Sequence, residues 1–110
     1  NDLLSTAKQG LRWFRQYYRD QPQLNRPAAN AAFKRAREAI SEYPYACKRF
    51  EGAPGVFERK IAKTAFSILY TVREDTVYII DVRDQRGLRS AHAIDAHIEE
   101  LRRRLPRKTS

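Results

Sequence analysis

The sequence is short of cysteine and of long apolar runs, and both shortages narrow the class of protein. Cys47 is the only cysteine, so the chain can form no internal disulfide and no cysteine-based zinc site. No stretch approaches the roughly 18 continuous apolar residues that a membrane span requires. The first residues also lack the basic and apolar regions of a signal peptide. We therefore expect a soluble cytoplasmic protein that does not associate with membranes.

Motifs that hold cofactors or metals are also missing. There is no glycine-rich phosphate loop and no arrangement of serine, histidine and aspartate whose spacing indicates nucleophilic catalysis. His92 and His97 are five residues apart, so on a helix they point in different directions and do not chelate one metal. We interpret Cys47 as a small buried apolar side chain. The sequence predicts neither a metal nor a cofactor.

Positive charge is what the sequence has in excess. Its 110 residues, the size of a single domain, include 22 Lys and Arg against 13 Asp and Glu, which leaves a formal net charge of +9. The excess is spread along the chain and does not form a separate basic tail. Most of these side chains solvate helix faces. The net charge nevertheless indicates an acidic partner, with nucleic acid, the ribosome and an acidic protein as the candidates.

Apolar residues at helical spacing predict an αα-hairpin in the first 44 residues. The first helix ends before Pro22, and the second has Pro27 in its first turn and ends by Pro44. The apolar stripe of the first helix consists of Leu3, Leu4, Ala7, Leu11, Phe14 and Tyr18. The stripe of small residues on the second consists of Ala29, Ala32, Phe33, Ala36 and Ile40. Small residues allow the two helices to pack closely.

The middle of the chain predicts a small antiparallel sheet. Residues 65–72 and 76–82 are rich in β-branched and aromatic residues and form a β-hairpin around a polar turn at 73–75. A further strand is predicted within residues 56–62. Both strands of the hairpin are expected to be largely buried, because each has apolar residues on both faces.

A last helix is predicted beyond Gly87, within residues 88–110. Its apolar positions are Leu88, Ala91, Ile94, Ile98, Leu101 and Leu105. We therefore predict one α+β domain over residues 1–110, with the αα-hairpin packed on the sheet. The C-terminal helix either closes the core or forms an arm that binds a partner.

Five basic residues flank the predicted hairpin. They are Arg59, Lys60, Lys63, Arg83 and Arg86. Antiparallel pairing places the start of one hairpin strand beside the end of the other, so all five are expected at one end of the sheet. This group is a candidate site for a nucleic acid or another anionic target. Ordinary charged strand ends produce the same pattern, and that interpretation stays open.

The order of these elements, with three segments in particular, resembles the RelE/ParE superfamily of bacterial type II toxins over about residues 2–87. The segments are Glu58-Arg59-Lys60-Ile61, Phe66-Ser67-Ile68-Leu69-Tyr70-Thr71-Val72 and Ile79-Ile80-Asp81-Val82-Arg83-Asp84-Gln85-Arg86. The first four residues are similar to the start of the first helix in that family. The family normally begins with an edge strand. Either that strand is missing from this chain or the sheet is unusually small, and we favour the first alternative, because loss of the strand would leave an unpaired apolar edge.

The resemblance implies a toxin that a cognate antitoxin neutralises in a hetero-oligomer, with two mechanisms open. One is ribosome-dependent cleavage of messenger RNA, for which the candidate catalytic residues are Lys60, Arg83, Arg86 and His92. Ser67 occupies a position that is arginine in those nucleases, and a serine cannot offset phosphate charge. Gln85 and Arg86 correspond to a His/Tyr pair of some relatives and supply no base with a neutral pKa.

The incomplete nuclease set favours the second mechanism, in which members of the ParE type poison DNA gyrase by binding it. The positive charge also suits the ribosome or RNA. A third class stays open, a nontoxic basic protein that uses the same fold only to bind nucleic acid.

Overall fold

The computed structural model describes residues 2–51, 53–86 and 90–105, which form three helices and one five-stranded sheet. In chain order the elements are β1 (Asp2–Leu3), α1 (Ser5–Arg19), α2 (Arg26–Glu42), β2 (Lys48–Arg49), β3 (Phe57–Lys60), β4 (Phe66–Arg73), β5 (Thr76–Asp84) and α3 (Ser90–Arg104). The strand order is β1-β5-β4-β3-β2. The α+β class is as predicted, but the sheet is mixed because β1 runs parallel to β5.

The N-terminal residues differ from the prediction. Asp2 and Leu3 were expected to begin the first helix, but they form a strand that pairs with Tyr78 and Ile79. The amide of Leu4 continues the pairing by donating to the carbonyl oxygen of Ile79 at 3.0 Å. These hydrogen bonds satisfy backbone groups at the edge of β5. The same residues in a helix could not form them, because helical backbone groups bond within the helix. The prediction that the chain lacks an edge strand was therefore wrong.

The hairpin β4–β5 is present, with a tighter turn than expected. Arg73 and Thr76 pair directly, so the turn consists of Glu74 and Asp75 alone. Both turn residues have positive φ, 50° and 64°, as a two-residue turn that matches the twist of the strands requires. Most residues of both strands are buried, as predicted for strands covered on both faces.

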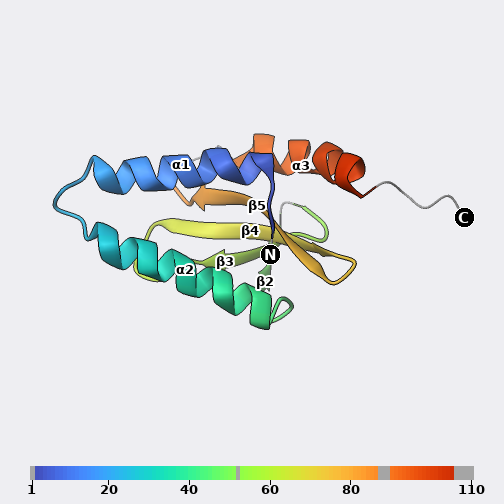
Figure 1. Cartoon of the computed structure of the whole chain (residues 1–110), viewed down its shortest axis with the longest axis horizontal. Coiled ribbons are helices and arrows are strands. Elements are labelled where there is room, and N and C mark those ends of the chain that lie inside the picture. Colours follow the sequence, from blue (N-terminus) through green and yellow to red (C-terminus); the bar gives the residue numbers. More distant parts are fainter. Residues whose placement is uncertain (1, 52, 87–89, 106–110) are drawn as a thin grey trace, which may run out of the picture.

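The αα-hairpin covers one face of the sheet (Figure 1). Its core is aromatic: the Phe14 ring of α1 lies 5.7 Å from that of Phe33 in α2 and 5.0 Å, edge-on, from that of Phe66 in β4. Asn25 caps α2 by accepting a 3.0 Å hydrogen bond from the amide of Ala28. Pro27 lies in the first turn, as predicted.

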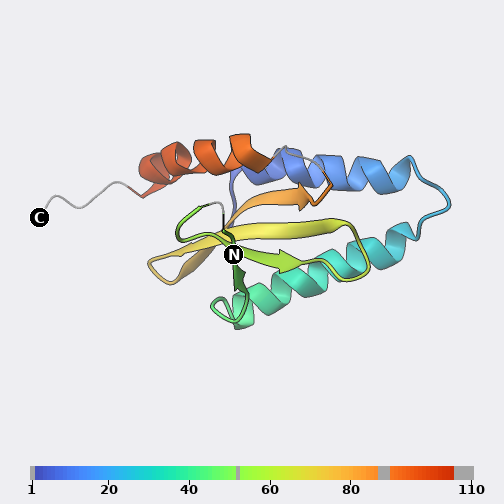
Figure 2. The same ribbon diagram turned by 180° about the vertical axis from the view of Figure 1, so that it is seen from behind.

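The helix α3 lies along the β5 side of the sheet, next to α1 (Figure 2). A second apolar cluster there joins Leu101 of α3 to Leu69, Ile80 and Leu4. The C-terminal helix therefore closes a core, one of the two roles proposed for it. Leu4 belongs to this cluster and not to the stripe of α1 predicted from spacing.

The buried face of α3 is rotated from the predicted one. Ile98 is 44% exposed, whereas the neighbouring His97 is 3% exposed and its Nδ1 contacts the carbonyl oxygen of Ile94. Burial lowers the pKa of His97, which favours the neutral imidazole in the folded chain. The predicted position Leu88 and the side chain of Ala91 lie outside the described residues.

A carboxylate from α3 caps the start of α1. Leu4 precedes that helix and has no side chain that accepts a hydrogen bond. Both oxygens of Glu100 lie 2.9 Å from the amide nitrogen of Ser5, and Arg104 binds the same carboxylate at 2.9 Å. The negative charge also complements the helix dipole. The two helices are thus joined although 95 residues separate the bonded pair.

Gly10 allows α1 to lie directly against the backbone of β5. A Cβ atom at this position would lie 2.7 Å from the nitrogen and 2.8 Å from the oxygen of Val82, and 2.1 Å from Oδ1 of Asp81. No side chain fits in such a space, because the obstructing atoms include backbone. Glycine is unfavourable inside a helix, so its presence here reflects this close packing.

Replacing Gly10 with alanine should destabilise the protein. Helix propensity alone predicts a gain of roughly 1 kcal/mol, but the clash with Val82 should reverse the sign and leave a net loss of about 1–3 kcal/mol. Urea unfolding of Gly10→Ala measures the difference, with Gln9→Ala at the adjacent exposed position as the control. A more stable Gly10→Ala variant would show that the contact is not required.

Candidate anion-binding surface

Three strands bring two of the predicted basic residues together. Lys60 of β3 pairs with Ser67 of β4, and Ser67 pairs with Arg83 of β5. Residues directly opposite one another across antiparallel strands project from the same face of a sheet. Lys60 and Arg83 therefore flank Ser67 in one row, on the face that α3 covers in part.

Glu58 lies beside this row, on the same face of the sheet. It is two residues before Lys60 on the same strand, so it projects from the same face. Its Oε2 accepts hydrogen bonds from the hydroxyl of Ser67 at 2.6 Å and from Nη1 of Arg83 at 2.8 Å. The side chains of Arg83 and Glu58 are 26% and 20% exposed, so water screens the pair only in part. The charge of Arg83 is therefore compensated within the protein.

Arg59 does not belong to this row. It pairs with Ile68, whose side chain lies in the core beneath α1 and α2, and so it projects from the opposite face. Its Nη1 donates to Sγ of Cys47 at 3.6 Å. Cys47 is half-buried and packs against the apolar core, which agrees in part with the prediction, and it also lies beside this guanidinium. Arg59 therefore lies next to Lys60 along β3 but on the other face of the sheet, so it does not share a surface with Lys60 and Arg83.

Arg86 is bound to the protein by several contacts. Its Nε and Nη2 donate to the two carboxylate oxygens of Asp84 at 2.9 and 3.0 Å, and its Nη1 donates to the hydroxyl of Tyr17 at 2.9 Å. The guanidinium also lies 4.6 Å from the centre of the Tyr17 ring. The hydrogen bonds from Arg86 lower the pKa of Asp84. Arg86 thus connects the end of β5 to α1.

The remaining candidates are the two lysines and His92. Lys60 and Lys63 are exposed, and neither makes an ion pair within the part of the chain that the structure describes. Lys63 lies in the turn between β3 and β4 with a φ of 59°. The side chain of His92 lies outside the described residues. Lys60 and Lys63 are therefore the basic groups at this end of the sheet that remain available to a ligand.

Two acidic residues that the sequence analysis did not select determine the charge of this surface. Glu58 and Asp84 each neutralise one of the predicted arginines. The position of Glu58 could have been predicted from the sequence, because residues 58 and 60 of one strand project from the same face. The proximity of Asp84 to Arg86 in sequence was visible too, but the third partner, Tyr17, comes from α1 and required the tertiary structure.

Comparison with known proteins found no protein family whose model matches the chain and no curated protein with significant similarity to it. Within residues 2–51, 53–86 and 90–105, no helix is both long and apolar enough to cross a membrane.

Removing the carboxylate of Glu58 should cost stability. Glu58→Ala leaves the half-buried guanidinium of Arg83 and the buried hydroxyl of Ser67 without their acceptor, for an expected loss of about 1–3 kcal/mol. Glu99→Ala is the matched control, because it breaks an ion pair with Arg102 in which both side chains are mostly exposed. That control should change stability by less than about 1 kcal/mol. Equal losses in the two variants would contradict the role given to Glu58.

The Asp84–Arg86 pair should contribute to the acid sensitivity of the fold. Because Arg86 lowers the pKa of Asp84 from its ordinary value of 3.8, the contribution of this carboxylate is complete above that value and is lost as the pH falls through the lower, folded-state pKa. Asp84→Asn should therefore be less stable than the wild type at neutral pH, and the difference should shrink in strong acid. The midpoints of urea unfolding of Asp84→Asn and the wild type, measured from neutral pH to strong acid, test this prediction.

Asp75→Asn provides the control for that titration. Asp75 is exposed in the hairpin turn, where asparagine also tolerates positive φ. This variant should stay close to the wild type at every pH. A difference between Asp84→Asn and the wild type that is the same at neutral and acid pH would contradict the assignment.

Proposed function

We propose that this chain is the toxin of a bacterial type II toxin-antitoxin pair and that it inhibits growth by binding its target, with DNA gyrase as the first candidate. The proposal rests on the RelE/ParE resemblance and on the arrangement of the elements. An edge strand, an αα-hairpin and a set of antiparallel strands follow one another in the order that the resemblance implies. The strand β1 at the edge of the sheet supports the proposal, because that family normally begins with an edge strand.

The carboxylate of Glu58 is the observation that favours binding over RNA cleavage. A nuclease of this superfamily needs uncompensated basic groups to offset phosphate charge and to activate the ribose hydroxyl. Here Ser67 replaces one such group, and Glu58 neutralises Arg83. Arg86 is held by Asp84 and Tyr17. A carboxylate in contact with Ser67 and Arg83 repels a phosphate and weakens any catalytic role of its neighbours.

The alternative is a ribosome-dependent mRNA endonuclease. Lys60 favours it, because this lysine is exposed on the same face as Arg83 and makes no ion pair within the described residues. The net charge of +9 also suits RNA. In this alternative, changing Lys60, Arg83 or Arg86 to alanine abolishes cleavage. A nontoxic nucleic-acid-binding protein of the same fold is the third candidate.

The antitoxin is proposed to bind the outer edge of the sheet and the basic surface beside it. The edge strand β2 has only two residues, both basic and exposed, and its outer side has no strand partner among the described residues. An acidic antitoxin segment that adds a strand or lays a helix there would complement this charge. Toxin and antitoxin together form a hetero-oligomer in this proposal.

Induction of the protein in a bacterial host that lacks the antitoxin tests the proposal. We expect growth arrest, intact messenger RNA and gyrase-dependent DNA breaks, measured by primer extension and by trapping of the cleaved DNA. Lys60→Ala is the matched variant, since Lys60 is exposed and its replacement should leave the fold intact. Messenger RNA cleavage that Lys60→Ala abolishes would establish the nuclease instead. Absence of growth arrest would favour the nontoxic class.

A further inference from the structure

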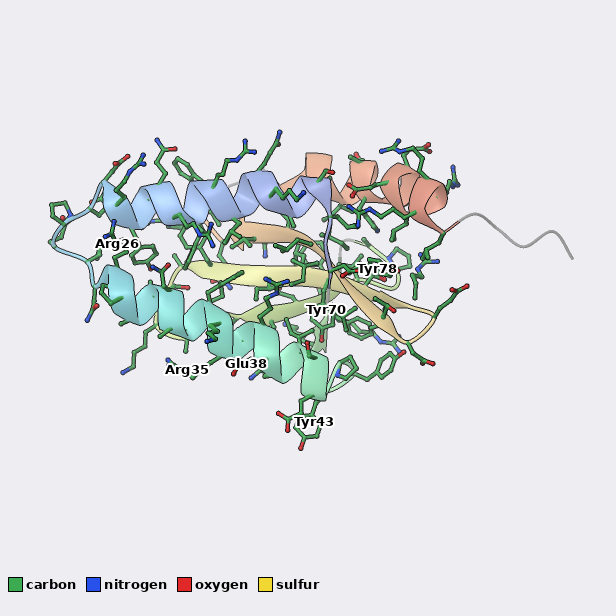
Figure 3. The ribbon with its side chains drawn as sticks, viewed as in Figure 1. Arg26, Arg35, Glu38, Tyr43, Tyr70 and Tyr78 are labelled. Atoms are coloured by element: carbon green, nitrogen blue, oxygen red, sulfur yellow. The ribbon has the colours of Figure 1, made fainter. Side chains whose placement is uncertain are left out.

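A second basic feature lies on the helical layer, away from the sheet surface. An open groove of about 450 Å³ runs between α1 and α2 near the turn that joins them. Its lining residues are Arg12, Arg15, Gln16, Arg19, Arg26 and Asn30. Figure 3 shows Arg26 at the end of the hairpin where the two helices meet, and Arg35 on the side of α2 remote from α1. The two helices thus bring four arginines to one groove.

The charges in this groove have little compensation. The helix α1 carries Lys8, Arg12, Arg15 and Arg19 and contains no acidic residue. Arg19 pairs with Asp20 at 3.5 Å, but both side chains are more than half exposed. Arg12, Arg15 and Arg26 make no ion pair with any described residue. The groove is therefore strongly positive, in contrast to the neutralised row around Glu58.

Such a cluster reduces the stability of the isolated domain. Arg12, Arg15 and Arg19 follow one another at spacings of three and four residues, so their side chains lie on one side of α1. Like charges at these spacings repel one another, by a few tenths of a kcal/mol per pair. Among the described residues, only the exposed ion pair between Arg19 and Asp20 offsets part of that repulsion. An external anion would offset it.

We infer that the groove between α1 and α2 binds the phosphodiester backbone of a nucleic acid. Arginine is suited to this ligand, because its planar guanidinium can donate two parallel hydrogen bonds to one phosphate. Arg12 and Arg19 are separated by about 10 Å along the helix axis, over which one strand of a duplex carries about three phosphates. The amides of Gln16 and Asn30 add neutral donors between the charges.

The lining of the groove favours nucleic acid over an acidic protein. Protein interfaces usually have an apolar or aromatic centre surrounded by polar residues. The residues that line this groove in the described part of the chain are all arginine, glutamine or asparagine. A ligand with a repeating charge and little apolar surface matches that composition. This inference does not depend on the toxin proposal, because it uses neither the sheet surface nor the family resemblance.

Fluorescence anisotropy with a short labelled DNA duplex and with a single-stranded RNA of the same length tests the site. The test variant is Arg12→Gln/Arg15→Gln/Arg26→Gln, which removes three exposed charges from the groove. We expect its affinity for the preferred nucleic acid to fall roughly tenfold or more. The slope of log affinity against log salt should fall by about 2 to 3. Comparison of the two probes identifies DNA or RNA as the source of the backbone.

The control variant is Arg35→Gln/Arg73→Gln/Arg103→Gln, which removes the same charge from exposed positions outside the groove. It should change the affinity less than threefold. All three substituted positions in each variant are exposed, so circular dichroism should show the wild-type fold in both, and the affinities are compared for folded protein. Equal losses in the two triple variants would overturn the inference, because the binding would then reflect net charge alone. No binding of either nucleic acid, or equally tight binding of labelled polyglutamate, would also overturn it.

Discussion

The packing of α1 against the backbone of β5 at Gly10 determines where most other contacts form. Because no side chain separates the helix from the strand there, α1 follows β5 closely along its length. One end of the helix then reaches α3, where Glu100 caps Ser5. Further along, Tyr17 reaches Arg86 at the end of β5. A displaced helix would lose both connections, although they lie at opposite ends of α1.

The basic residues of this protein lie in two different electrostatic environments. On the sheet, carboxylates of Glu58 and Asp84 neutralise the arginines at the end of β5, and the resulting networks connect strands and helices. Between α1 and α2, several arginines lie together, and the one acidic partner they have among the described residues is the exposed Asp20. Charges in the first setting stabilise the fold. Charges in the second oppose it and are available to a ligand, which is why the net charge alone does not locate the binding surface.

Sequence periodicity predicted the positions of the helices and strands better than it predicted which of their faces are buried. The αα-hairpin, the β4–β5 hairpin and the C-terminal helix were all predicted, because their apolar spacings are regular and proline or glycine marks their ends. Periodicity failed for α3, where it placed Ile98 inward although the structure buries His97. It also failed for Asp2 and Leu3, because a two-residue strand is too short to show alternation and forms only when a partner edge is present.

The sequence by itself determined the class of the fold, the positions of the main elements and the excess of positive charge, since these follow from local spacing and composition. Only the tertiary structure decided which of those charges are neutralised. Lys60 and Arg83 share a face through strand register, whereas Arg59 turns to Cys47 on the other. The groove of four arginines joins residues from two helices. Ion pairing depends on distances of a few ångströms between residues that are often far apart in the chain. The spacing of residues within one segment does not predict those distances.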